Sequence, residues 1–248
     1  MCIVVLLSTF AISAEALPHI TIDKELGEIR IEGQTSSLHW SGAILEFFVL
    51  SGDDRAYESL VTTKASPLHI HAALMSLGFI PDKRETAQLI DCWIEYADEN
   101  GKVETIRLER LAKSLRTKSA SPDIPFAFTG SYMTENPHDR EGPPVLAATI
   151  TGAVIGLFDD PSAILTLPFS EPSPYSFSGV GFISETSQYP VCMTEDWMVK
   201  LDGKNLTPCK APKEYPVTII LRRSKLPRPT GILQTNIDAA DPSTQNDM

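Results

Sequence analysis

Alternating apolar and polar residues predict a β-hairpin near the start of the chain. In residues 19–33, HITIDKELGEIRIEG, two short alternating runs are joined by polar residues and a glycine at 24–27. A period of two places every second side chain on the same face of a strand. The apolar positions that share the predicted buried face are Ile20, Ile22, Ile29 and Ile31.

Further segments have the β-branched and apolar composition of strands. They cover residues 43–50, 56–63, 89–97, 103–108, 145–151, 153–158, 178–183 and 216–221. The first two are separated by the turn sequence Ser-Gly-Asp-Asp at 51–54, so we expect them to form a second strand pair. Asn100 and Gly101 separate the next two and are a strong hairpin signal.

One amphipathic helix is predicted over residues 67–77. Ser66 followed by Pro67 is a helix-start signal, because the serine hydroxyl can accept a hydrogen bond from a free backbone N–H and proline has none to lose. Gly78 can adopt the left-handed conformation that ends a helix. The apolar stripe at helical spacing consists of Ile70, Ala73, Leu74 and Leu77. A second short helix is predicted over residues 109–115.

The balance of these elements favours an α+β fold, an antiparallel-rich sheet domain with one or two short helices. A parallel sheet needs a helix between successive strands to cover its faces. Too few helical segments alternate with strands here for that arrangement. The chain has 248 residues, of which 42% are hydrophobic, enough to build a core.

Three segments carry a family resemblance: YESLVTTKASPLHIHAALMSLG at 57–78, FAFTGSYM at 126–133 and PVTIILR at 216–222. Together they resemble the YdjY-like domain, a family of uncharacterised proteins of bacterial envelopes. The resemblance implies a single domain over residues 17–223 and implies no agreed reaction or catalytic residue. Some members look as if they carry an iron–sulfur motif, which we do not transfer because this chain has no clustered Cys-x-x-Cys run.

Residues 1–16, MCIVVLLSTFAISAEA, have the pattern of a signal peptide. An apolar run is followed by small residues, with Ala14-Glu15-Ala16 as an A-x-A cleavage site. The run is too short for a stable membrane span. A basic segment before it is missing, so a buried N-terminal strand and an uncleaved signal anchor stay as alternatives. We expect a secreted or periplasmic protein.

The other end of the chain predicts a different state. Residues 224–248 are polar with no sustained periodicity, which predicts a disordered tail.

The formal net charge of −11 and the pI of about 4.9 argue against a nucleic-acid partner, because binding to phosphate needs clustered Lys and Arg.

Three cysteines remain if the leader is cleaved. Cys192 and Cys209 lie in loop-rich sequence and are the favoured disulfide pair, whereas Cys92 lies in a predicted strand and is expected to be a buried thiol. Two reduced cysteines at 192 and 209 remain the alternative. No G-x-G-x-x-G, Walker or H-E-x-x-H motif is present, so we expect no cofactor and no metal.

Glu58 and His71 are the weak candidates for catalysis. A carboxylate that orients an imidazole in a cleft would support acid–base chemistry. His69 and His71 are two residues apart, and on a helix their rings point about 200° apart and cannot chelate one metal. A partly buried structural role for His71 is the simpler interpretation, because Leu68, Ala72 and Met75 lie on its side of the helix.

Ser131, Tyr132 and His138 are the weak candidates for ligand binding, in and after FAFTGSYM. Gly130 favours a strand bulge over a catalytic turn, since Ser131 is not in a G-x-S-x-G sequence. The polar loop at 135–139 holds possible cation ligands, although a solvated loop explains the same composition.

The leading hypothesis is a non-enzymatic domain of the cell envelope that binds a small ligand or another envelope protein, through loops around FAFTGSYM and the helix at 67–77. The alternative is an envelope hydrolase or metal-assisted enzyme that uses Glu58, His71 and His138. A structural module of a larger assembly is the third possibility.

Overall fold

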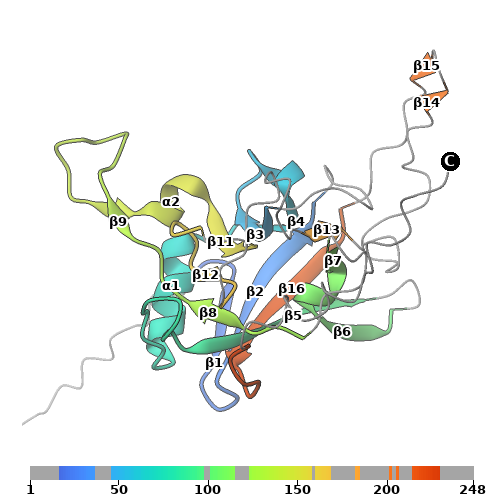
Figure 1. Ribbon diagram of the computed structural model, residues 1–248, viewed down its shortest axis with the longest axis horizontal. Coiled ribbons are helices and arrows are strands. Elements are labelled where there is room, and N and C mark those ends of the chain that lie inside the picture. The colour runs from blue at the N-terminus through green and yellow to red at the C-terminus, as the bar shows by residue number, and fades with distance from the viewer. Residues whose placement is uncertain are drawn as a thin grey trace, which may run out of the picture.

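The protein is built around a closed β-barrel. The computed structural model describes residues 17–36, 46–97, 101–114, 123–157, 160–168, 182–184, 201–202, 205–206 and 214–229. Within them, one sheet runs in the order β2, β16, β5, β8, β12, β11, β3 and β4, and β4 pairs back to β2 (Figure 1). Two further strands extend this sheet outside the barrel: β1 pairs with β2, and β6 pairs with β5.

The strands are β1 (Ile20–Asp23), β2 (Glu28–Thr35), β3 (Phe47–Ser51), β4 (Ser59–Thr63), β5 (Leu89–Ala97), β6 (Val103–Arg107), β7 (Ala112–Ser114), β8 (Phe126–Phe128), β9 (Met133–Thr134), β10 (Val145–Leu146), β11 (Ala153–Gly156), β12 (Leu165–Thr166), β13 (Phe182–Ser184), β14 (Leu201–Asp202), β15 (Asn205–Leu206) and β16 (Pro216–Arg223). The α-helices are α1 (Pro67–Ser76) and α2 (Ala147–Thr151), and the 3-10 helices cover Ala56–Glu58 and Leu108–Leu111. Three two-stranded sheets, β9–β10, β7–β13 and β14–β15, complete the described elements.

The predicted α+β class is wrong, because the fold is mostly β and its main sheet is closed. The barrel closes through two long strands, β2 and β5, each of which pairs with two different strands along the same edge. β2 pairs with β1 along Glu28–Ile31 and with β4 along Gly33–Thr35. β5 pairs with β8 at Leu89 and Ile90 and with β6 from Trp93 to Ala97. Alternation in the sequence predicts that such strands exist but does not specify which neighbours they take.

The strand pair β3–β4 is parallel, although the turn sequence between the two strands suggested a hairpin. Phe47 pairs with Ser59 and Ser51 with Thr63. The 3-10 turn at Ala56–Glu58 returns the chain to the start of β3 before β4 begins. β11 and β12 repeat this parallel arrangement, with Ile155 opposite Leu165, so the barrel contains two similar short β–turn–β units.

The opening hairpin and the β5–β6 hairpin form as the sequence predicted. The hydrophobic core, built by the barrel strands and α1, holds large apolar side chains that are almost fully buried. Its largest members are Phe48, Phe126, Phe128, Ile29, Ile31, Leu50, Leu60, Ile70, Leu74 and Ile90. Phe48 and Phe126 meet edge to face, with ring centroids 5.5 Å apart.

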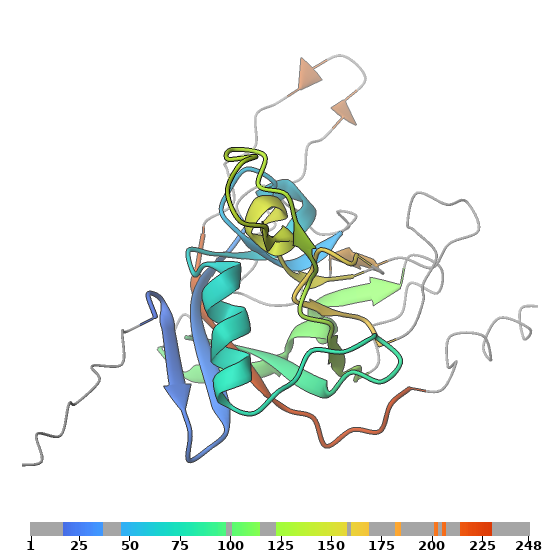
Figure 2. The same ribbon diagram turned by 90° about the vertical axis from the view of Figure 1, so that its left-hand side faces the viewer.

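The predicted helix is confirmed as α1. Ile70, Ala73 and Leu74 are completely buried in the core, and Gly78 has the expected left-handed φ of 80°. Ser66 makes no side-chain cap; its backbone carbonyl accepts the hydrogen bond from Ile70 N instead. α1 contacts β1 and stands beside the β1–β2 hairpin (Figure 2).

Two local predictions are wrong. Residues 145–151, predicted as a strand, form the short strand β10 followed by α2. Residues 109–115, predicted as a helix, begin with the end of a 3-10 turn and continue into β7. Short apolar segments satisfy both helical and strand patterns, and tertiary contacts decide between them.

The first residues of the predicted tail pack against the barrel. Ser224 donates its backbone N–H to Leu89 O at 2.9 Å, and Arg228 donates to the carbonyl oxygens of Arg84 and Ala87. The rest of the predicted tail, residues 230–248, lies outside the described residues.

Candidate functional site

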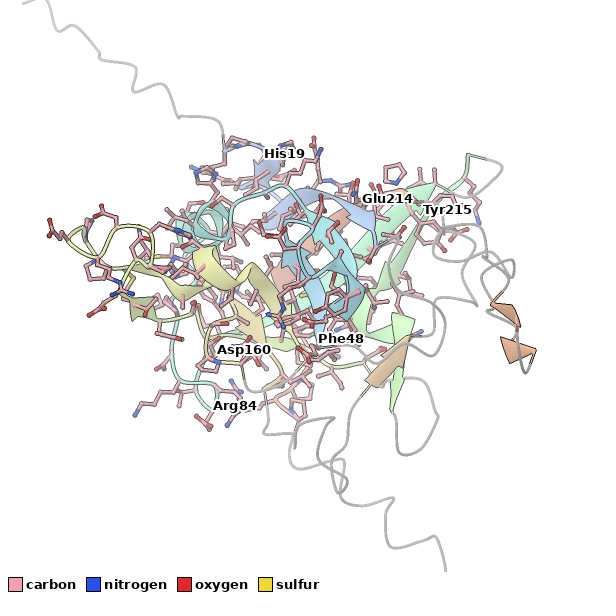
Figure 3. All side chains as sticks on the ribbon, turned by 90° about the horizontal axis from the view of Figure 1, so that it is seen from above. His19, Phe48, Arg84, Asp160, Glu214 and Tyr215 are labelled. Atoms are coloured by element: carbon pink, nitrogen blue, oxygen red, sulfur yellow. The ribbon has the colours of Figure 1, made fainter. Side chains whose placement is uncertain are left out.

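A cavity of about 540 Å³ lies on the outer surface of the barrel. Its floor comes from β2, β16, β5 and β6, and its walls come from the residue before β1, the turn after β3 and the end of β4. Figure 3 shows His19 and the start of β16, marked by Glu214 and Tyr215, along one side of the molecule, with Arg84 and Asp160 on the opposite side. The lining residues are His19, Glu32, Gly33, Gln34, Asp53, Thr62, Thr63, Lys64, Glu95, Tyr96, Ala97, Val103, Pro216, Val217 and Thr218.

Strand register brings the floor residues together. Thr218 on β16 pairs with Glu32 on β2 and with Glu95 on β5, so these three residues form one row across the sheet. Ile31 on β2 and Ile219 on β16 are fully buried. Because neighbouring residues of a strand point to opposite faces, Glu32 and Thr218 point outward, and the cavity is on the outside of the barrel.

The cavity lies where two neighbouring strands separate. The described pairing of β16 with β5 stops at Thr218 opposite Glu95. β16 continues to Pro216 along β2, whereas β5 continues to Ala97 along β6. Proline lacks the N–H that a continued ladder would need, which fits the end of pairing at this point.

His19 forms one wall in a backbone conformation that few non-glycine residues adopt. Its φ is 64°, in the left-handed region, where histidine is more frequent than most residues. Two hydrogen bonds join it to Glu32: the backbone N–H of Glu32 donates to His19 O at 3.0 Å, and His19 Nδ1 lies 2.8 Å from Glu32 Oε2. The imidazole is therefore held at the rim of the cavity.

Carboxylates outnumber cations in the lining. The lining contains three carboxylates, those of Glu32, Asp53 and Glu95, and one lysine, Lys64. Glu95 also accepts a hydrogen bond from Arg30, which lies outside the lining and bonds to Glu28 on its own strand.

A buried charge cluster supports the same sheet next to the cavity. Arg107 on β6 donates to Asp91 Oδ1 at 3.0 Å and to Glu109 Oε1, and its guanidinium lies 5.0 Å from the centroid of the Trp93 ring. Glu109 is fully buried, and Ile124 N donates to it at 2.9 Å. Burial raises the pKa of the Glu109 carboxyl, although the Arg107 guanidinium acts in the opposite direction.

The face around α1 has a different character. His71 is half-buried, and its ring centroid lies 5.4 Å from that of Phe128. Gly130 follows β8 with φ of 76°, and a Cβ there would lie 2.4 Å from Pro81 Cβ and 3.1 Å from His71 Nε2. This close packing and the left-handed backbone explain why glycine occupies position 130. The pKa of His71 is lowered by burial.

Glu58 and His71 are not brought together. Glu58 precedes β4 and forms an ion pair with Arg55, which also donates to Glu46 Oε2 at 2.9 Å. His71 lies on α1, which follows the opposite end of β4. The ring of His71 packs against Phe128 instead, and within the described residues no hydrogen bond or ion pair joins His71 to Glu58.

The three predicted ligand-binding residues lie away from the cavity. Ser131 Oγ accepts a hydrogen bond from Ala148 N at 3.0 Å, which satisfies the start of α2. Tyr132 exposes about half of its surface, and its carbonyl oxygen accepts from Ala147 N. His138 lies in the loop between β9 and β10, where its backbone N–H donates to Asn136 Oδ1 at 3.0 Å.

The described residues also bear on the predictions about metal ligands and cysteines. In the part of the chain that the structure describes, no group of three or more His, Cys, Asp or Glu side chains is arranged to hold a metal ion. Cys92 is a free, buried thiol, as predicted, and burial raises its pKa. Cys192 and Cys209 lie outside the described residues, so their pairing stays a prediction.

Comparison with known proteins identifies the family. The model of the YdjY domain family matches residues 20–190, more than half of the chain, and the protein therefore belongs to this family. No curated protein and no solved structure gives a significant match. Among the described helices, none combines the length and apolar character that crossing a membrane would require.

Sequence reasoning missed the cavity residues, above all His19, Glu32 and Glu95. The signal that was present is the outward-facing polar series Arg30, Glu32 and Gln34 on a strand whose alternate residues are buried. Such a series is also typical of a solvated strand face, and only the pairing with β16 and β5 turns it into a site.

Proposed function

We propose that this protein is an exported ligand-binding domain of the bacterial envelope and that the cavity on β2, β16 and β5 is its binding site. The observation that carries the proposal is the cavity itself. Its volume of about 540 Å³ lies within the range of small-molecule sites, roughly 300–1,000 Å³. Export rests on the leader pattern at residues 1–16 and on the envelope association of the family.

The composition of the lining supports binding rather than a particular reaction. Apolar groups from Ala97, Val103 and Pro216 lie beside a few polar groups that converge from different strands, the arrangement typical of a ligand site. Glu58 and His71, the acid–base pair suggested by the sequence, do not line this cavity. A binding domain is therefore the function that the geometry supports best.

Ligand binding can be tested by a fragment screen followed by two-dimensional NMR. Fragments that bind in the cavity are expected to shift the amide signals of residues 32–34, 95–97, 217 and 218. Thr218→Trp fills the floor of the cavity and is expected to abolish these shifts, because the indole takes the space of the ligand. Thr149→Trp, at an exposed position of α2, is the matched control and should leave binding unchanged.

Two results would contradict the binding site. One is a set of fragments that perturb only the α1 or β9 signals, and the other is binding that survives Thr218→Trp. Export is tested separately, by the intact mass of the protein recovered from the exported fraction of expressing cells. A mass that lacks residues 1–16 supports export, and a full-length mass found only in the cytosol contradicts it.

A further inference from the structure

We infer that residues 224–229 act as a latch that keeps the loop at 79–88 closed over the end of β8, and that release of Arg228 opens this loop. The latch is independent of the proposed binding site, because neither it nor the loop contributes a residue to the lining of the cavity. The contacts of the loop, the contacts of the latch and the sequence of the latch support this assignment.

The loop at 79–88 joins α1 to β5 and has no helix or strand of its own. Most side chains of residues 81–86 are exposed. Two backbone hydrogen bonds tie the loop to the end of β8: Asp82 N donates to Phe128 O at 3.2 Å, and Phe128 N donates to Gln88 O at 3.0 Å. A segment with few buried apolar contacts opens at a low cost in free energy unless further contacts hold it.

The loop covers a buried aromatic contact. The Phe79 ring meets the fully buried Phe128 ring edge to face, with centroids 6.4 Å apart, and the His71 ring lies 5.4 Å from Phe128. Pro81 packs against the backbone of Gly130, where an added Cβ would lie 2.4 Å from Pro81 Cβ. Opening of the loop would therefore admit water to Phe128 and to the neighbouring His71.

Arg228 holds the loop from its outer side. Its Nη1 donates to Arg84 O at 2.7 Å, and its Nη2 donates to Ala87 O. These two carbonyl oxygens belong to one turn, in which Ala87 N donates to Lys83 O at 2.7 Å. One guanidinium therefore cross-links both ends of the turn, and its charge makes such hydrogen bonds stronger than neutral ones.

The latch is anchored at its start. Ser224 N donates to Leu89 O at 2.9 Å, and Ser224 Oγ donates to Asp91 Oδ1 at 2.7 Å. Asp91 belongs to the buried charge cluster of the sheet, so the latch begins at a fixed point. Immediately before it, the Arg223 guanidinium lies 4.4 Å from the centroid of the Phe79 ring.

The sequence of the latch favours one extended conformation. Pro227 and Pro229 flank Arg228. Proline fixes its own φ at about −65° and disfavours the helical conformation in the residue before it. Little conformational entropy is therefore lost when Arg228 is placed against the loop.

Amide hydrogen exchange of the whole chain, followed by NMR, tests the latch. Arg228→Gln removes the guanidinium, and we expect exchange at Asp82 and Phe128 to become about tenfold faster or more, as the loss of charge-assisted hydrogen bonds implies. Arg228→Lys keeps the charge but loses the planar fork, so an intermediate acceleration is expected. The core amides of Ile31 and Ile219 should keep the wild-type rate, because only the loop opens.

Lys225→Gln is the matched control, since it removes the same charge from an exposed position of the latch. It should leave the exchange rates unchanged. Trypsin gives a second measurement, because Lys83 and Arg84 are cleavage sites on the loop. Cleavage after them should be faster in Arg228→Gln than in Lys225→Gln.

Three results would overturn the inference. One is equal exchange in Arg228→Gln and Lys225→Gln. Another is an equal acceleration of the core amides, which would show that Arg228 supports the whole barrel rather than the loop. The third is wild-type exchange at Asp82 and Phe128 at the rate of an unstructured peptide, since the loop would then already be open. Fragment binding in the cavity decides the proposed function separately.

Discussion

Two faces of this molecule differ in how their side chains are held. On the face formed by β2, β16, β5 and β6, charged side chains are fixed by partners, as Arg107 on β6 is by Asp91 on β5 and by Glu109 in the 3-10 turn that follows β6. The face made by α1, α2 and β9 has exposed apolar side chains such as Leu68 and Met133, and its histidine, His71, is half-buried against Phe128. The first face forms a cavity with directed polar groups, whereas the second offers close packing and little charge.

The difference indicates that the stability of the two faces depends on different interactions, ion pairs on the first and close packing on the second. A buried charge that loses its partner is costly, so the strand face should be sensitive to removal of single ionic groups. The α1 face should be sensitive to added volume at its packed centre and tolerant of change at its exposed rim. The following predictions test this contrast in order of decreasing effect.

Glu109→Ala is expected to have the largest effect. It leaves Arg107 without one buried partner and Ile124 N without its acceptor, and loss of one member of a buried pair costs about 3–5 kcal/mol. Chemical denaturation measures the change in the free energy of unfolding. The control Glu104→Ala removes an exposed ion pair with Lys102 and should cost below about 1 kcal/mol. Equal losses for the two variants would refute the special role of the buried cluster.

Gly130→Ala is expected to destabilise the α1 face by about 2–4 kcal/mol, because the new methyl group meets Pro81 and the left-handed backbone disfavours a side chain. Gly78→Ala is the matched control. The φ of Gly78 is also positive, at 80°, and a Cβ added there would meet no atom within 4 Å. This variant should cost only the backbone part, about 1–2 kcal/mol. A thermal or denaturant unfolding curve that gives the two variants equal stability would show that the contact with Pro81 is unimportant.

His71 should make the α1 face sensitive to pH. Burial lowers its pKa in the folded state, so the unfolded chain takes up a proton first as the pH falls. The stabilisation from neutral His71 is therefore present above the ordinary pKa of about 6.5 and is lost as the pH falls toward the lower folded pKa. The stability difference between wild type and His71→Gln, measured from pH 8 to 5, should shift against the wild type on acidification. His138→Gln is the exposed control, and the same shift there would contradict the role of burial.

Met75→Gln is expected to have the smallest effect. The side chain is half exposed on α1, and surface substitutions of this kind usually change stability by less than about 0.5 kcal/mol. The variant should also bind the fragments that occupy the cavity like the wild type, because α1 contributes no residue to the cavity. Loss of fragment binding in Met75→Gln would show that the two faces are coupled.

The local elements with strong signals were predictable. The opening hairpin, the hairpin around Asn100-Gly101 and the helix with its glycine stop all rest on residues close together in the sequence. The segment at 145–151 was not predictable, because its apolar residues suit a strand, and it becomes a helix only where Ser131 and Tyr132 accept the N–H groups of Ala148 and Ala147.

The candidate site could not be predicted from the sequence, for a related reason. Glu58 and His71 are thirteen residues apart and were proposed to meet, yet Glu58 pairs with Arg55 and His71 packs against Phe128. Glu32, Glu95 and Thr218 are far apart in the chain and share one row. Distance along the chain was a poor guide to contact in both cases, because strand register sets the neighbours.

The sequence by itself determined the family, the helix, two hairpins and the acidic character of this protein, because these properties depend on composition and on residues within a few positions of each other. The tertiary structure decided that the sheet closes, that β3 and β4 run parallel, and that a cavity opens where β16 and β5 separate. Each of these depends on pairings between distant strands. Their register is selected by burial of a shared core, and no local pattern encodes it.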